Sequence, residues 1–139
     1  MGQMDGKVAI VTGGGSGIGK GIAKAFVDEG CSVVIAARGA ERLEAAAVEL
    51  SSNGGTVVAI QTDVTNEDEV AALAKAAREF FSEKIDILVN VAGVTGPIET
   101  PAWEIDVDDF DFVLGANVRG TFLPIKHIIP SMVAQKSGK

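Results

Sequence analysis

Short apolar runs alternate along the chain with longer stretches in which apolar residues recur every three or four positions. Residues 8–11 form the first run, an unbroken series rich in β-branched side chains, as expected of a strand that is covered on both faces in a parallel sheet. After a glycine cluster, Ile18, Ile22 and Phe26 follow at helical spacing, and Gly30 provides a stop signal. The sequence therefore predicts a strand followed by a helix.

The same alternation continues along the chain. It predicts further strands at residues 33–36, 57–60 and 85–89, and helices at residues 40–52, 65–81 and 107–135. The third helix is expected to open with a capping box at residues 65–68, in which aspartate replaces the usual Glu or Gln. Residues 95–106 are expected to form a loop. Pro124 deletes one backbone hydrogen bond from the last helix, so we expect a kink or break there.

The order βαβαβαβα predicts an α/β fold of the Rossmann type, with three layers in which helices cover both faces of a parallel sheet of about four strands. A chain of 139 residues fits one domain better than two. Residues 136–139 form a polar, turn-like tail where such an architecture ordinarily leads into another strand. We therefore expect one Rossmann domain over residues 1–139, incomplete at its C-terminus.

Composition and charge narrow the classes of partner. The formal net charge of −7 at pH 7 opposes nonspecific attraction to nucleic acid or to an anionic membrane. No stretch approaches the roughly 20 apolar residues that span a bilayer. Cys31 is the only cysteine, which leaves no disulfide framework and no zinc-ligand spacing and favours a reducing cytoplasm. The sequence predicts no metal site, no nucleic-acid partner and no membrane partner.

The glycine cluster stands between the first strand and the first helix, where an open α/β sheet binds the pyrophosphate of a nucleotide. Its spacing from Thr12 is TGxxxGxG and does not match GxGxxG, because Ile18 occupies the position of the last glycine. The glycines allow a sharp turn, a close approach of backbone to phosphate, and tight packing of helix on strand. The expected dinucleotide contacts in this loop are Gly13, Ser16, Gly17, Ile18 and Gly19.

At this motif the sequence resembles the short-chain dehydrogenase/reductase family, whose N-terminal signature is TGxxxGxG after the first strand. Three further stretches agree with that resemblance, which covers essentially the whole chain. Asp63 and Val64 resemble the pair that holds the adenine ring in that family. Residues 90–93 are similar to its NNAG motif, with Val91 replacing the second asparagine, and contribute Asn90, Ala92 and Gly93. Asn117 matches a helix asparagine that, in complete enzymes, helps to organise a proton-relay water beside the catalytic lysine.

The end of the second predicted strand bears on the choice of nicotinamide cofactor. A carboxylate there hydrogen-bonds the ribose hydroxyls of NAD(H), whereas NADP(H) needs a group that tolerates a phosphate. Ala37 occupies the carboxylate position and Arg38 follows it with a planar fork suited to phosphate. Glu41 lies past the strand and would have to reach back. We therefore favour NADP(H) over NAD(H).

The resemblance implies hydride transfer between a nicotinamide and a small-molecule alcohol or carbonyl, catalysed by a tyrosine, a lysine and a serine. The 139 residues contain no tyrosine, so we expect the chain by itself to be inactive. Residues 107–135 carry more apolar side chains than one face of a small sheet covers, so we expect a homo-oligomer. Two alternatives remain open. The first is a natural dinucleotide-binding module or sensor that catalyses no reaction. The second is a Rossmann protein with a different ligand, such as a methyl-donor-dependent transferase, but that class ordinarily has an acidic residue where this sequence has Ala37 and Arg38.

Overall fold

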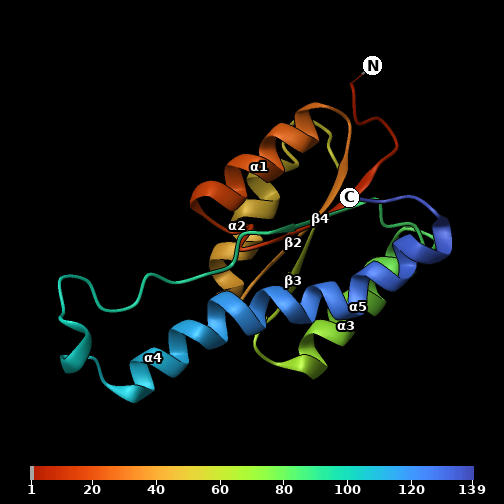
Figure 1. Ribbon diagram of the computed structural model, residues 1–139. Coiled ribbons are helices and arrows are strands. Elements are labelled where there is room, and N and C mark those ends of the chain that lie inside the picture. The colour runs from red at the N-terminus through yellow and green to blue at the C-terminus, as the bar shows by residue number, and fades with distance from the viewer. Residues whose placement is uncertain (1) are drawn as a thin grey trace.

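The computed structural model describes residues 2–139 and contains one parallel sheet of four strands in the order β3-β2-β1-β4 (Figure 1). The strands are β1 (Val8–Thr12), β2 (Ser32–Ala37), β3 (Val57–Gln61) and β4 (Ile87–Asn90). The helices that connect them are α1 (Gly17–Asp28), α2 (Ala40–Leu50) and α3 (Glu67–Phe80), followed by α4 (Val107–Leu114) and α5 (Gly120–Gln135). The Rossmann-type prediction is thus confirmed.

The core has two halves, one on each face of the sheet. Alternate residues of a strand point to opposite faces, so Val11 and Ile35 pack with α1 and α2, whereas Ile10 and Val34 pack with α3 and α5. All four side chains are completely buried, which explains why β1 and β2 read as unbroken apolar runs. The helices lie on either side of the sheet in three layers (Figure 1).

Two local expectations about the helices were wrong. The N-cap of α3 is Asn66, whose Oδ1 accepts a hydrogen bond from the amide of Glu69 at 3.2 Å. Thr65 does not cap the helix, because its hydroxyl donates to Asp63 instead. Ile18 does not belong to a buried stripe of α1, since its side chain is 76% exposed and the helix packs through Gly19 and Ala23.

The last predicted helix is also different in the structure. A π-helical segment, Gly115–Arg119, separates α4 from α5 and is called the π segment below. Pro124 lies inside α5, which runs through it from Gly120 to Gln135. The irregularity therefore precedes Pro124 instead of coinciding with it, and Pro124 cannot donate the hydrogen bond that would close the turn above Gly120.

Within residues 2–139, only Lys139 pairs with the outer edge of β4. Lys139 donates its amide to the carbonyl of Asp86 and accepts from the amide of Leu88, both at 3.0 Å. This pattern is the beginning of a parallel strand pair. Among residues 2–139, no helix has the length and apolar character needed to cross a bilayer, and no three His, Cys, Asp or Glu side chains are grouped to hold a metal ion.

Candidate functional site

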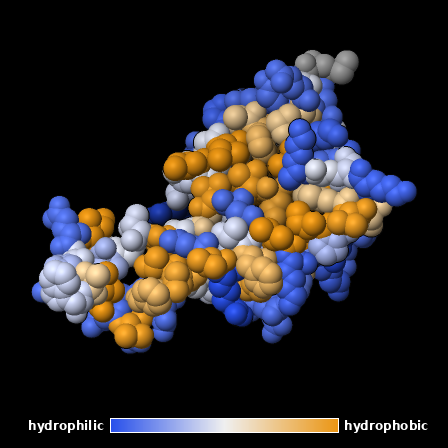
Figure 2. Space-filling view, in the orientation of Figure 1, coloured by the Kyte–Doolittle hydropathy of each residue, from blue (hydrophilic) through white to orange (hydrophobic). Residues whose placement is uncertain are grey.

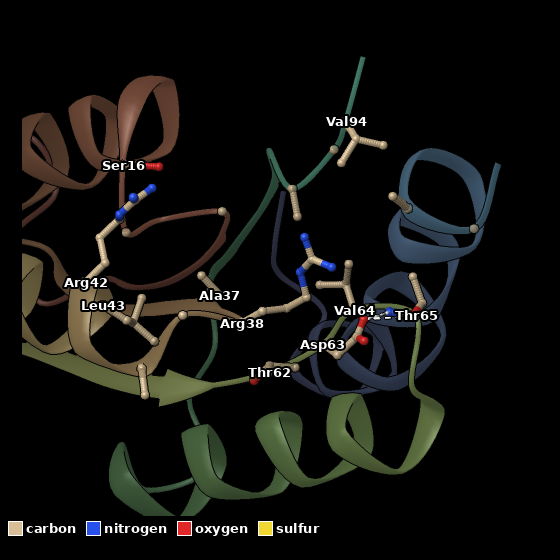
Figure 3. A pocket seen from close by; sticks show the side chains of 18 of the residues that line it. Ser16, Ala37, Arg38, Arg42, Leu43, Thr62, Asp63, Val64, Thr65 and Val94 are labelled. Carbon is tan, nitrogen blue, oxygen red and sulfur yellow. Dashed lines mark hydrogen bonds between the residues drawn. The ribbon is translucent and has the colours of Figure 1, made fainter. Parts of the chain in front are cut away.

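A cleft of about 1250 Å³ opens at the carboxyl ends of the strands. The loops that follow β1, β2, β3 and β4 line it, and α4 with the start of the π segment closes its far side. This position, outside the carboxyl edge of a parallel sheet, is where open α/β folds place their ligands. Figure 3 shows the lining side chains that come from these loops.

The turn from β1 to α1 needs glycine because its neighbours leave no space for a side chain. Gly13 has a φ of +67°, and a Cβ added to it would stand 2.9 Å from the backbone nitrogen of Ala92. A Cβ on Gly19 would overlap the carbonyl oxygen of Gly13. Helix α1 can therefore start directly against the turn, with its N-terminus at the mouth of the cleft.

The N-terminus of α1 offers unpaired donors. Ser16 is the N-cap residue, and its side chain makes no capping hydrogen bond. The amides of Gly13 and Gly14 are already directed to the carbonyl of Ala36, at 2.7 and 3.4 Å. The amides of the first turn of the helix have no hydrogen-bond acceptor within the helix. Together with the helix dipole, such amides favour the binding of an anion.

Thr12 connects this turn to the loop after β4. Its hydroxyl oxygen accepts hydrogen bonds from the amides of Val91 and Ala92, at 3.1 and 3.2 Å. Thr12 is completely buried, so these bonds are shielded from water and fix the two loops relative to each other. Asn90, at the end of β4, carries a buried Oδ1 that has no hydrogen-bond partner among residues 2–139.

Asp63 follows β3 and is held by Thr65. Its Oδ1 accepts from the Thr65 hydroxyl at 2.7 Å and from the Thr65 amide at 2.9 Å. These two bonds, chiefly that of the hydroxyl, lower the pKa of the Asp63 carboxyl, and the charge of Arg38 adds to the effect while partial burial opposes it. Asp63 is therefore ionised at neutral pH.

Two arginines face the cleft, one from the end of β2 and one from the first turn of α2. Arg38 directly follows β2, and its carbonyl accepts a hydrogen bond from Gln61 Nε2 at 2.8 Å. Arg42 lies one helical turn further on and extends toward Ser16, whereas Arg38 extends into the middle of the cleft (Figure 3). Within residues 2–139 neither guanidinium pairs with a carboxylate, although most other lysines and arginines do.

Asn117 lies in the π segment and clamps the loop after β4. Its Oδ1 accepts from the amide of Val94 and its Nδ2 donates to the carbonyl of Val94, both at 2.8 Å. A Cβ added to Gly93 would stand 2.8 Å from the same Oδ1. The side chain thus satisfies both backbone groups of one residue and positions the loop next to α4.

The predicted site residues fall into two groups. Seven of them line the cleft, namely Gly13, Ser16, Arg38, Asp63, Val64, Ala92 and Gly93. The remaining ones do not line it, namely Gly17, Ile18, Gly19, Asn90 and Asn117. Sequence reasoning missed the cleft-lining Arg42, although its place in the first turn of the helix after Arg38 was a signal. It also missed Thr12 as a connection between loops, since that contact spans about 80 residues of chain.

Comparison with known proteins defines the class. The family model for the short chain dehydrogenase matches residues 7–139. An uncharacterized oxidoreductase of Staphylococcus aureus strain MW2 is 39% identical over 132 residues, which are 95% of this chain and 55% of that protein. The structure of NAD+-bound xylitol dehydrogenase matches with a TM-score of 0.94 and 33% identity, covering 98% of this chain and 52% of the other.

The chain belongs to the short-chain dehydrogenase family. A metagenomic short-chain oxidoreductase in complex with NADP matches it with a TM-score of 0.90 and 32% identity, over 97% of this chain and 60% of that one. The family binds nicotinamide dinucleotides, and these two neighbours hold NAD+ and NADP, respectively. The chain spans about half the length of the relatives that it matches.

Proposed function

We propose that this chain is the dinucleotide-binding part of an NADP(H)-dependent oxidoreductase that interconverts an alcohol and a carbonyl. The observation that carries the proposal is the pair of arginines in the cleft. Arg38 and Arg42 line it without a carboxylate partner among residues 2–139, in a chain of net charge −7. A ligand with a phosphate at the ribose end supplies the anion that such guanidinium groups bind.

The residues of the cleft fit such a dinucleotide along its length. The first turn of α1 has free amides and an uncapped Ser16 for the diphosphate. Asp63 offers an ionised carboxylate for the adenine end. Ala37, at the end of β2, carries no charge that would repel a 2′-phosphate. When bound, the nicotinamide supplies the two-electron exchange with the substrate carbon, while these residues bind and orient the dinucleotide.

The test is a titration of the chain with NADPH and with NADH. Arg38→Ala should weaken NADPH binding by about 1–3 kcal/mol, because it removes a charge-assisted hydrogen bond, and should leave NADH nearly unchanged. Arg78→Ala is the matched control, since Arg78 pairs with Glu83 away from the cleft. An equal loss for both dinucleotides in Arg38→Ala would contradict the preference for NADP(H).

We also propose that the chain alone does not turn over substrate. The 139 residues contain no tyrosine, and a missing general acid lowers the rate by about 10²–10⁴-fold. In this proposal Asn117 contributes to the catalytic site of a complete enzyme by holding the loop at Val94 in place. Consumption of NADPH with a panel of ketones, above a control without protein, would refute the proposed inactivity.

The apolar surface of α4 and α5 supports self-association. Phe110 and Phe122 are each 56% exposed, and Ile125 is 42% exposed. Figure 2 shows hydrophobic side chains gathered along these helices on the face in view. Because exposed patches of this kind favour association, we propose that the chain forms homo-oligomers. Light scattering that shows a stable monomer at high protein concentration would contradict this.

A further inference from the structure

Arg119 lies outside the cleft but contacts the loop that carries Asp63. Its Nε donates a hydrogen bond to the carbonyl oxygen of Thr65 at 2.9 Å. Within residues 2–139, Arg119 forms no ion pair with a carboxylate. This guanidinium, at the end of the π segment, therefore binds a backbone carbonyl of the β3–α3 loop and no carboxylate among residues 2–139.

Thr65 transmits that contact to the carboxylate. Both the hydroxyl and the amide of Thr65 donate to Asp63 Oδ1, at 2.7 and 2.9 Å. The structure gives Asp63 Oδ2 no hydrogen bond with any of residues 2–139, and Asp63 lines the cleft. One carboxylate oxygen is thus held by the protein, while the other remains available to a ligand.

The same loop is held at two further points. The amide of Asp63 donates to Glu69 Oε2 of α3 at 2.6 Å. On the other side Gly120 lies close under Val64, because a Cβ added to Gly120 would stand 2.6 Å from Val64 Cγ2. Residues 63–65 are therefore fixed between α3 and the junction of the π segment with α5, and Arg119 supplies the polar contact from that junction.

We propose that Arg119 is a positioning residue for base recognition. By holding the Thr65 carbonyl, it keeps both Thr65 donors on Asp63 Oδ1 and presents Oδ2 to an exocyclic amino group, such as that of adenine. The inference rests on the proposed function, in which Asp63 binds the adenine end. An ionised carboxylate only accepts hydrogen bonds, so it binds an aminopurine and repels the carbonyl oxygen of an oxopurine.

The experiment compares the binding of NADPH with that of its hypoxanthine analogue, in which a carbonyl replaces the amino group. Arg119→Met keeps the aliphatic stem and removes the donor, whereas Arg119→Lys keeps a cationic donor. Arg78→Met is the matched control, because Arg78 pairs with Glu83 away from the cleft.

We expect the wild-type chain to prefer the adenine form by about tenfold, which corresponds to one hydrogen bond to a charged group. Arg119→Met should reduce that preference to about twofold, and Arg119→Lys should retain most of it.

A second measurement does not depend on the dinucleotide. The pKa of the Asp63 carboxyl, followed by ¹³C NMR, should lie below its ordinary value of 3.8 in the wild-type chain and in Arg78→Met. It should rise toward that value in Arg119→Met, because the Thr65 donors are no longer held on Oδ1.

An adenine preference that survives Arg119→Met, or an Asp63 pKa that does not change, would overturn the inference alone. A wild-type chain that binds neither dinucleotide would overturn the proposed function, and the Asp63 pKa would then still decide whether Arg119 positions the carboxylate.

Discussion

The two sides of the cleft are built in different ways. On one side, the turn from β1 to α1 lies against the loop after β4 with no space for a Cβ at Gly13 or Gly19, and the buried Thr12 connects the two loops. On the other side, α4 projects from the body of the molecule with no buried residue (Figure 1). The first side is fixed by packing, whereas the second is joined to the cleft loops by the Asn117 and Arg119 hydrogen bonds and by the contact of Gly120 with Val64.

This difference separates two tasks. The phosphate end of a dinucleotide needs backbone amides at fixed positions, and the core of the sheet provides that rigidity. The opposite side is held to the cleft loops by a few side-chain contacts. Mutations on the two sides should therefore differ in their effect on stability.

The largest effect is expected in the core beneath the glycine turn. Ile35 of β2 is completely buried, so Ile35→Ala should lower the free energy of unfolding by about 2–5 kcal/mol. Phe110 of α4 is 56% exposed, and Phe110→Ala should change the free energy of unfolding by no more than about 0.5 kcal/mol. Urea unfolding of both variants measures the contrast, and similar losses would show that α4 is packed as firmly as the sheet.

The next largest effect is expected at the turn itself. Gly19→Ala forces a methyl group onto the Gly13 carbonyl and should cost about 1–3 kcal/mol. Gly21 lies in the same helix with nothing within 4 Å of an added Cβ, so Gly21→Ala should stabilise the chain by about 0.5–1 kcal/mol. Thermal unfolding of the pair gives opposite shifts of Tm. A Gly19→Ala variant as stable as the wild type would show that the turn is not tightly packed.

A smaller effect is expected at the attachment of the projecting side. Asn117→Ala removes both hydrogen bonds to Val94 and should cost about 1 kcal/mol, since the side chain is partly open to solvent. Asn53→Ala, in the exposed turn after α2, is the control and should have almost no effect. If urea unfolding gives the same free energy of unfolding for the two variants, the hydrogen bonds of Asn117 to Val94 do not stabilise the second side.

The sequence predicts the first side better than the second for a physical reason. The glycine spacing, the apolar run before it and the helical period after it are all local, and Gly13 and Ser16 line the cleft. The hydrogen bond between Asn117 of the π segment and Val94 spans 23 positions of chain, and no local pattern reports such a contact. Arg119 illustrates the same limit, because its partner Thr65 lies 54 positions away.

The errors in the helices have a similar origin. Both Thr65 and Asn66 are good N-cap residues, and the competing hydrogen bond of Thr65 to Asp63 decides between them. The break expected at Pro124 was wrong, because α5 runs through this residue and the irregularity is the π segment before it.

The loop between β4 and α4 has a consequence for limited proteolysis. Within residues 2–139, the backbone N–H groups of residues 95, 96 and 98–100 donate no hydrogen bond, and residue 97 is a proline without one. Such segments are the preferred sites of nicking. A protease should therefore cut there first. The two pieces should nevertheless stay together, because Leu123 and Ile128 of α5 are buried against the rest of the molecule.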